Sequence, residues 1–156
     1  MIKLHKVLVP TDFSDFSRPA VDYGCAMAAR FSAELHLLHI VPDPAMLIPE
    51  AGAFSVEAIE AQGAELTKIA AEQLKEIPGS DWENGQPIIR EVRTGTIHEE
   101  IIDYAKACDI DLIVIGTHGR SGFMHILMGS VAERIVRTSV CPVLTVKPNE
   151  RHFVTP

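Results

Sequence analysis

The feature of this sequence that most limits its fold is an alternation of five short apolar runs with four longer segments of helical period. The runs have the length and β-branched content of strands, and they cover residues 6–10, 35–41, 87–94, 111–116 and 142–148. Because helix-length crossovers separate successive strands, the strands must run parallel in one sheet. The sequence therefore predicts an α/β fold, with a doubly wound, five-stranded parallel sheet inside a Rossmann-like three-layer sandwich.

The helical segments place apolar or small residues on one face, which we expect to pack on the sheet. In the first three segments these positions are Val21, Gly24, Cys25, Ala28 and Phe31; Val56, Ile59, Gly63, Leu66, Ala70, Leu74 and Ile77; and Ile97, Ile101, Ile102, Ala105 and Cys108. Ser17 supplies a hydroxyl that can cap the first helix. Thr96 with Glu99, and Ser130 with Glu133, have the spacing of a capping box, so they predict the starts of the third and fourth helices.

Length and charge limit the class of protein. A chain of 156 residues is about the size of one domain, which we assign to residues 1–148, followed by a C-terminal tail at 149–156. The formal net charge of −7, without a cluster of basic residues, argues against nucleic acid or an anionic membrane as a partner. No apolar stretch reaches the ~18 residues of a membrane span, and the first residues resemble a strand rather than a signal peptide. We therefore expect a cytoplasmic protein.

The cysteines predict no cross-link or metal centre. Cys25, Cys108 and Cys141 are odd in number and form no C-x-x-C pair, so we expect three buried free thiols. The stretch that begins at His98 lacks the second histidine of the H-E-x-x-H zinc motif. The sequence thus indicates neither a disulfide framework nor a protein-bound metal.

The site is expected beyond the carboxyl ends of the strands, where the winding of such a sheet reverses. Pro10, Thr11 and Asp12 end the first strand and are candidate site residues for that reason. No G-x-G-x-x-G, P-loop or G-x-S-x-G motif occurs anywhere in the chain. The simple dinucleotide fingerprint, the P-loop and the nucleophile elbow are thereby excluded, and no catalytic constellation is evident.

A different glycine pattern follows the fourth strand. Gly116 and Gly119 are three residues apart, and nine residues separate Gly119 from Gly129 and Ser130. Glycine permits a positive φ and a close approach of a ligand to the main chain. Gly129 and Ser130 open the fourth helix, where free amides and the helix dipole stabilise an anion. The pattern predicts a polyphosphate site that needs no basic surface.

This spacing, G-x-x-G, nine residues and G-[ST] after a strand, resembles the ATP-binding signature of the universal stress protein family. The resemblance extends from "KVLVPTDFS" through "LHLLHIV" to the last strand, which is nearly the whole chain. It implies a fold of the adenine nucleotide alpha-hydrolase-like type, and ATP with Mg²⁺ as the ligand.

The resemblance also implies roles for individual residues. Asp12 would hold the ribose or adenosine end, and the main chain at Val41 would meet the adenine edge. Ile115 and Gly116 would line the adenosine. The phosphates would be bound by Gly119, Gly129, Ser130 and Val131. Apart from the resemblance, Arg120 is either a phosphate clamp or a surface charge.

Several of these residues also have a purely structural explanation. Ser130 is a helix cap in many proteins, the glycines are common in turns, and Asp12 could cap the first helix. His118 and His125 lie in the glycine-rich segment without a catalytic partner, so we expect them to be solvated. Structural and ligand-binding roles can coexist at one position.

Two classes of function follow from the resemblance: a nucleotide-dependent regulatory module of the stress response, or a slow ATPase or nucleotidyl-transfer enzyme. Enzymes of the wider group often carry an S-G-G-x-D-S loop after the first strand, whereas "PTDFSDFS" contains no glycine. The missing glycines favour the module. No general base with a partner is evident, so we expect any ATP hydrolysis to be weak.

The last strand is expected to form a homodimer. It is bounded by prolines and comes last in the chain order, which is typical of an edge strand. Val143, Leu144 and Val146 would offer apolar side chains to a symmetry mate, and the resemblance implies the same interface. The alternative is an exposed edge that Lys147 and the prolines protect.

Overall fold

The strands form the sheet that the sequence pattern predicts. The computed structural model describes residues 2–43, 55–79, 82, 86–118 and 128–148. In this part of the chain the strands are β1 (Lys6–Pro10), β2 (Glu34–Pro42), β3 (Ile88–Gly95), β4 (Leu112–Gly116) and β5 (Val143–Val146). All pairs are parallel, in the order β3-β2-β1-β4-β5. The doubly wound parallel sheet is confirmed, with strand ends close to those expected.

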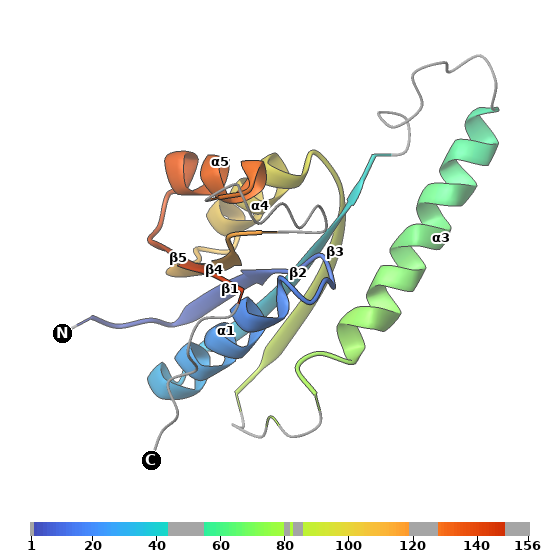
Figure 1. The fold of residues 1–156 in the computed structure, drawn as a ribbon. Helices are drawn as coiled ribbons and strands as arrows, with labels where there is room; N and C mark the ends of the chain where they lie inside the picture. The colour runs from blue at the N-terminus through green and yellow to red at the C-terminus, as the bar shows by residue number, and fades with distance from the viewer. Residues whose placement is uncertain (1, 44–54, 80–81, 83–85, 119–127, 149–156) are drawn as a thin grey trace.

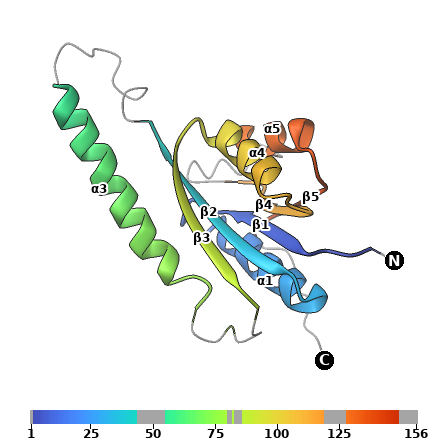
Figure 2. The ribbon, with the colours of Figure 1, turned by 180° about the vertical axis from the view of Figure 1, so that it is seen from behind.

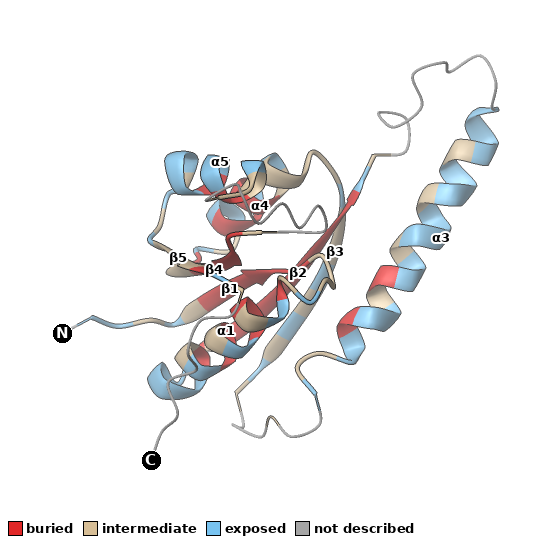
Figure 3. Ribbon diagram, viewed as in Figure 1, coloured by how far each residue is buried: buried red, intermediate tan, exposed pale blue. Residues whose placement is uncertain are grey.

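Helices cover both faces of the sheet. α1 (Arg18–Phe31) and α3 (Val56–Lys75) lie on one side, and α4 (Ile97–Ala107) and α5 (Ser130–Thr138) lie on the other (Figures 1 and 2). Alternate side chains of β1 point to opposite faces, so Val7 joins the core under α1 whereas Leu8 joins the core under α4 and α5. The central strands are the most buried part of the molecule (Figure 3). The three-layer sandwich is therefore confirmed.

Neither expected capping box forms. Thr96 is the N-cap residue of α4, but its side chain makes no capping hydrogen bond. The N-cap residue of α5 is Gly129, so Ser130 lies inside the helix and the predicted box from Ser130 to Glu133 is wrong. Gly129 takes this position because its N–H donates to the carbonyl of Thr117 at 2.6 Å, while its own carbonyl accepts the N–H of Glu133 at 3.0 Å. A spacing motif locates a helix start without deciding which atoms bond there.

Only the C-terminal half of α3 packs on the sheet. Ala70 and Leu74 are buried as expected, but Val56 is 68% exposed and Leu66 is 38% exposed. Figures 1 and 3 show the helix diverging from β3 towards its N-terminus. Phe31, the last residue of α1, is also 38% exposed rather than inward. The apolar period identifies a shared face, whereas the tilt of the helix decides how much of that face is covered.

The described helices, α3 included, lack the combination of length and apolar character that crossing a membrane requires.

The cysteines differ in burial. All three are free, but Cys25 alone is buried, whereas Cys108 and Cys141 are half-buried, so the prediction of three buried thiols is wrong for two of them. Cys25 lies between α1 and the sheet, and this burial raises the pKa of its thiol to about 12. At neutral pH the Cys25 thiol is therefore protonated.

The edge strand β5 is only partly available to a partner. Val146 is 1% exposed and belongs to the core under α1, so the expectation that its side chain meets a symmetry mate is wrong. Val143 and Leu144 are half-buried and pack against opposite cores. β4 pairs with one edge of β5, and α1 and α5 contact the strand from its two faces. The backbone N–H and carbonyl groups on the outer edge of β5 remain available to pair with a second copy of the chain.

Candidate functional site

A cavity opens at the carboxyl ends of β1 and β4, where the winding of the sheet reverses. Its volume of about 400 Å³ lies within the ~300–1,000 Å³ that is usual for small-molecule sites. The predicted site residues that line it are Pro10, Thr11, Asp12, Ile115, Gly116, Gly129, Ser130 and Val131. Val41 is not among the lining residues and is buried in β2. Gly119, Arg120 and His125 lie outside the described residues.

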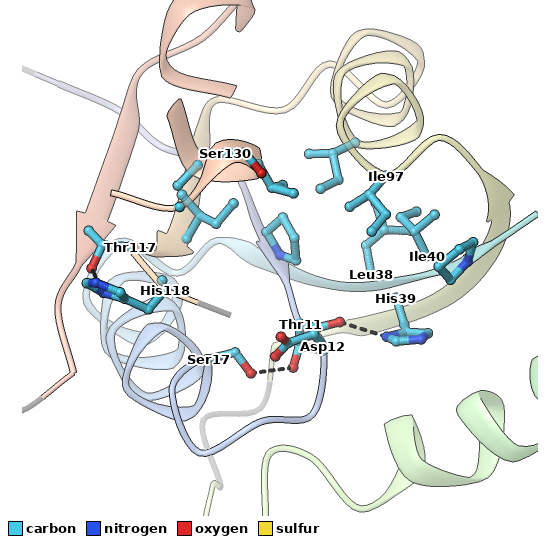
Figure 4. A pocket seen from close by; sticks show the side chains of 18 residues that line it. Thr11, Asp12, Ser17, Leu38, His39, Ile40, Ile97, Thr117, His118 and Ser130 are labelled. Carbon is cyan, nitrogen blue, oxygen red and sulfur yellow. Dashed lines mark hydrogen bonds between the residues drawn. The ribbon is translucent and has the colours of Figure 1, made fainter. Parts of the chain in front are cut away.

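One wall of the cavity is apolar. β2 contributes Leu38 and Ile40, α4 contributes Ile97 and Ile101, and Ile115 comes from the end of β4 (Figure 4). The helical period marks the two α4 residues as core positions, but no signal in the sequence shows that they also face a cavity. They do so because α4 begins beside the carboxyl ends of the strands. This wall can accept a flat apolar group.

The opposite wall is the loop between β1 and α1. The N–H of Thr11 donates to the carbonyl of Leu38 at 2.9 Å, which continues the pairing of β1 with β2. Thr11 Oγ1 accepts the N–H of Phe13 at 3.1 Å and lies 3.1 Å from Ser17 Oγ. Because the Ser17 hydroxyl donates to the carbonyl of Ser14 at 2.9 Å, Thr11 is the donor in its pair with Ser17.

These bonds also decide how α1 begins. Ser17 is the N-cap residue by position, but its side chain makes no capping hydrogen bond. The prediction that its hydroxyl caps α1 is wrong, since that hydroxyl bonds within the loop instead. Ser17 therefore stabilises the wall of the cavity.

Asp12 faces the cavity from this loop and is half-buried (Figure 4). Its Oδ1 accepts the N–H of Ser14 at 3.0 Å and the Ser14 hydroxyl at 2.6 Å. These bonds form an Asx turn before α1 begins, so they do not cap the helix. The turn holds the carboxylate in one orientation, in which it can accept hydrogen bonds from hydroxyl groups of a ligand.

Gly116 and Gly129 permit close contacts between backbone segments. A Cβ on Gly116 would lie 3.0 Å from the carbonyl oxygen of Phe16 and 3.3 Å from that of His118. A Cβ on Gly129 would lie 3.2 Å from the carbonyl oxygen of Thr117. Neither glycine has a positive φ, and Gly129 has a φ of −68°. The expectation of a positive φ is therefore wrong at Gly116, and both glycines serve close packing.

The N-terminus of α5 forms a third side of the cavity. The first intrahelical bond runs from the N–H of Glu133 to the carbonyl of Gly129, so the N–H groups of Ser130, Val131 and Ala132 precede it. All three of these residues line the cavity. A helix N-terminus carries the equivalent of roughly half a positive charge, which favours an anionic group beside it.

Two histidines complete the lining. His39 is buried, and its Nδ1 lies 2.8 Å from the carbonyl oxygen of Thr11, so that nitrogen carries the donated proton. His118 is half-buried, with Nδ1 at 2.9 Å from Thr117 Oγ1, so the expectation of a solvated side chain is wrong for it. Sequence reasoning missed His39 because a histidine inside an apolar strand is typical of a core. Among the described residues, no group of three or more His, Cys, Asp or Glu side chains is placed to hold a metal ion.

Comparisons with known proteins agree with this architecture. The model of the universal stress protein family matches residues 3–147. Universal stress protein MJ0531 of Methanocaldococcus jannaschii is 35% identical over 145 residues, which are 91% of this chain and 81% of that protein. The solved structure of protein MJ0577, from the same organism, has a TM-score of 0.80 at 28% identity over 97% of this chain and 99% of that chain.

A more distant likeness concerns the fold alone. A universal stress protein solved in complex with cAMP has a TM-score of 0.61 at 23% identity, over 95% of this chain and 100% of that chain. The family match, by contrast, extends over nearly the whole sequence and includes the three strands that line the cavity. The chain therefore belongs to the universal stress protein family.

Proposed function

We propose that this protein is a nucleotide-dependent regulatory module that binds ATP, with Mg²⁺, in the cavity between β1 and β4. The observation that carries the proposal is that the walls of this one cavity differ in polarity and charge. An apolar wall faces a loop that presents the carboxylate of Asp12, and the amides at the start of α5 form the third side. An adenine, a ribose and a phosphate chain match these three environments.

The proposal assigns each part of the ligand to particular residues. The adenine lies against Ile40, Ile97 and Ile115, with the main chain at Val41 near its edge. The ribose hydroxyls donate to Asp12, because a carboxylate accepts hydrogen bonds and would repel a phosphate. The phosphates lie at the start of α5, where amides point out of the helix. Gly119 and Arg120 remain part of the proposed phosphate site.

Mg²⁺ enters the proposal with the nucleotide rather than as a resident metal. It usually keeps several waters and binds through substrate phosphates and one or two carboxylates. The lining contains one described carboxylate, Asp12, and this is already oriented by Ser14. The phosphates would therefore hold most of the coordination sphere.

The test begins with protein purified without added nucleotide. Denaturing it and separating the supernatant by chromatography should reveal a bound adenine nucleotide. Calorimetry on the nucleotide-free protein should then show binding of ATP and of adenosine. The absence of both heat and a thermal shift at millimolar ATP would overturn the proposal, since a ligand that binds only the folded state must raise the melting temperature.

A blocking substitution makes the test specific to this cavity. Ile97→Trp replaces an aliphatic side chain of the apolar wall with a bulky indole ring. The ring should fill the cavity and abolish binding while the protein stays folded. Ile69→Trp is the matched control, because Ile69 lies on α3, is 47% exposed and does not line the cavity.

The release of phosphate from ATP, measured on the same samples, distinguishes a regulatory module from a slow ATPase. We expect little release.

We further propose a homodimer through the outer edge of β5. The strand is at the end of the sheet order, and Val140, just before it, is 60% exposed. Antiparallel pairing of two β5 strands about a two-fold axis would close the assembly.

The cytoplasm is the proposed location, because free cysteines persist in a reducing compartment.

A further inference from the structure

We infer that His39 is a positioning residue for the nucleotide: it holds the loop between β1 and α1 so that Asp12 faces the cavity. This inference rests on the proposed function. His39 is 8% exposed and lies on β2, beside the loop rather than in it (Figure 4). Its contacts with two loop residues on either side of Asp12 carry the argument.

The first contact is with the peptide that leads into Asp12. Consecutive residues of β2 bind both main-chain polar groups of Thr11. The carbonyl of Leu38 accepts its N–H at 2.9 Å, and His39 Nδ1 donates to its carbonyl at 2.8 Å. That carbonyl belongs to the planar peptide unit that joins Thr11 to Asp12. The bond from His39 therefore fixes the direction in which the chain enters Asp12.

The second contact is with the residue that follows Asp12. Phe13 has a φ of 63°, a left-handed conformation that non-glycine residues rarely adopt. Its ring stacks on the imidazole of His39, with centroids 4.4 Å apart and planes inclined by 27°. Its N–H also donates to Thr11 Oγ1 at 3.1 Å. His39 thus supports the unusual backbone that turns the chain immediately after Asp12.

The loop is in this way organised before a ligand arrives. A binding group that is already held in place loses less entropy when the ligand binds, so affinity rises without a new contact. Removal of His39 should release the peptide units on both sides of Asp12 while leaving the carboxylate itself intact. The affinity for the ribose end would then fall.

His36 provides a matched control on the same strand. It is 3% exposed, and its Nδ1 lies 2.8 Å from the hydroxyl of Tyr104 on α4. It is therefore a second buried, hydrogen-bonded histidine of β2, but it does not line the cavity. His36→Leu should lower stability without changing the affinity for adenosine.

The experiment is a double-mutant cycle read by calorimetry with adenosine. His39→Leu should weaken binding on the order of tenfold in the unsubstituted chain and have no further effect in the Asp12→Ala background. Equal losses in the two backgrounds would overturn the inference, because His39 would then not act through Asp12. His39→Asn keeps a donor nitrogen near the position of Nδ1, so it should retain most of the affinity.

A ligand-free measurement separates this inference from the proposed function. Amide hydrogen exchange at Phe13 and Ser14 should accelerate in His39→Leu and stay unchanged in His36→Leu. Unchanged exchange in His39→Leu would overturn the positioning role, whatever the chain binds. Failure of the unsubstituted chain to bind adenosine and ATP would overturn the proposed function instead, while exchange would still decide whether His39 holds the loop.

Discussion

Some residues around the cavity have two roles, because each of them stabilises the fold and also shapes the candidate site. Gly129 both begins α5 and approaches the carbonyl of Thr117, and Ser17 both precedes α1 and holds the loop that carries Asp12. The sequence identifies the residue types at these positions, but not their partners. A substitution at such a position therefore changes structural contacts as well as any contact with the ligand.

Asp12→Ala tests the ribose contact, and it also removes the Asx-turn bonds to Ser14. The substitution removes the acceptor oxygens and should weaken ATP and adenosine by the same factor, on the order of tenfold, as expected for a hydrogen bond to a charged group. Calorimetry with both ligands measures the two losses. Asp15→Ala is the control, because Asp15 is an exposed carboxylate in the same loop that does not line the cavity. A gain in ATP affinity would instead mean that the carboxylate only repels phosphate.

Among the elements, β2 and α4 are joined by polar contacts inside an apolar layer. His36 Nδ1 lies 2.8 Å from the Tyr104 hydroxyl, and His36 Nε2 lies 2.7 Å from Glu34 Oε1. Arg93 of β3 stands 4.8 Å from the centroid of the Tyr104 ring. Burial lowers the pKa of His36, although the carboxylate of Glu34 opposes part of this shift. Burial also raises the pKa of Tyr104. This cluster joins Tyr104, in the C-terminal half of α4, to β2 and β3.

The lowered pKa of His36 predicts a pH-dependent stability. The unfolded chain, with a histidine pKa of about 6.5, binds a proton before the folded chain does as the pH falls. The contribution of His36 is therefore complete above pH 6.5, and it is lost as the pH falls through the lower, folded-state pKa. Urea unfolding should show that the free energy of unfolding decreases from about pH 7.5 to about pH 5.5, and decreases less in His36→Gln.

The unsubstituted chain is the reference for this measurement. An identical slope in His36→Gln and the unsubstituted chain would show that other groups cause the pH dependence.

In the whole molecule, the doubly wound order leaves β3 and β5 at the two edges of the sheet. The N–H of Ile113 donates to the carbonyl of Pro142 at 3.0 Å, and the N–H of Thr117 donates to the carbonyl of Val146 at 2.8 Å. Because successive residues of a strand direct their peptide groups to opposite sides, those of Val143 and Thr145 point away from β4. These outward groups are available for pairing with a second copy.

Thr145→Pro tests the dimer at this edge. The substitution removes an outward N–H and keeps the bonds to β4, so the protein should stay folded and become a monomer. Sedimentation at micromolar concentration measures the state, and circular dichroism checks the fold. Thr145→Val keeps the N–H and should remain a dimer. Sedimentation of the unsubstituted chain as a monomer would contradict the proposal.

The parts of this protein that could be read from its sequence are those that depend on near neighbours in the chain. The apolar runs and helical periods predicted the strands, and the crossover lengths predicted their parallel order, because both follow from local geometry. The same argument placed the expected site beyond the carboxyl ends of the strands, which is where the cavity lies. Gly116 and Gly129, which the spacing singled out, line that cavity.

Contacts between distant segments could not be read in this way. His39 bonds to Thr11 across 28 residues of chain, and Tyr104 bonds to His36 across 68. Such pairs depend on strand register and helix tilt, which no short pattern encodes. The apolar wall of the cavity also depends on them, because its residues come from both β2 and α4. Gly129 rather than Ser130 is the N-cap residue for a similar reason, since its partner, the carbonyl of Thr117, lies just after β4. A side chain's partner is chosen by packing, because only the assembled layers bring these atoms within bonding distance.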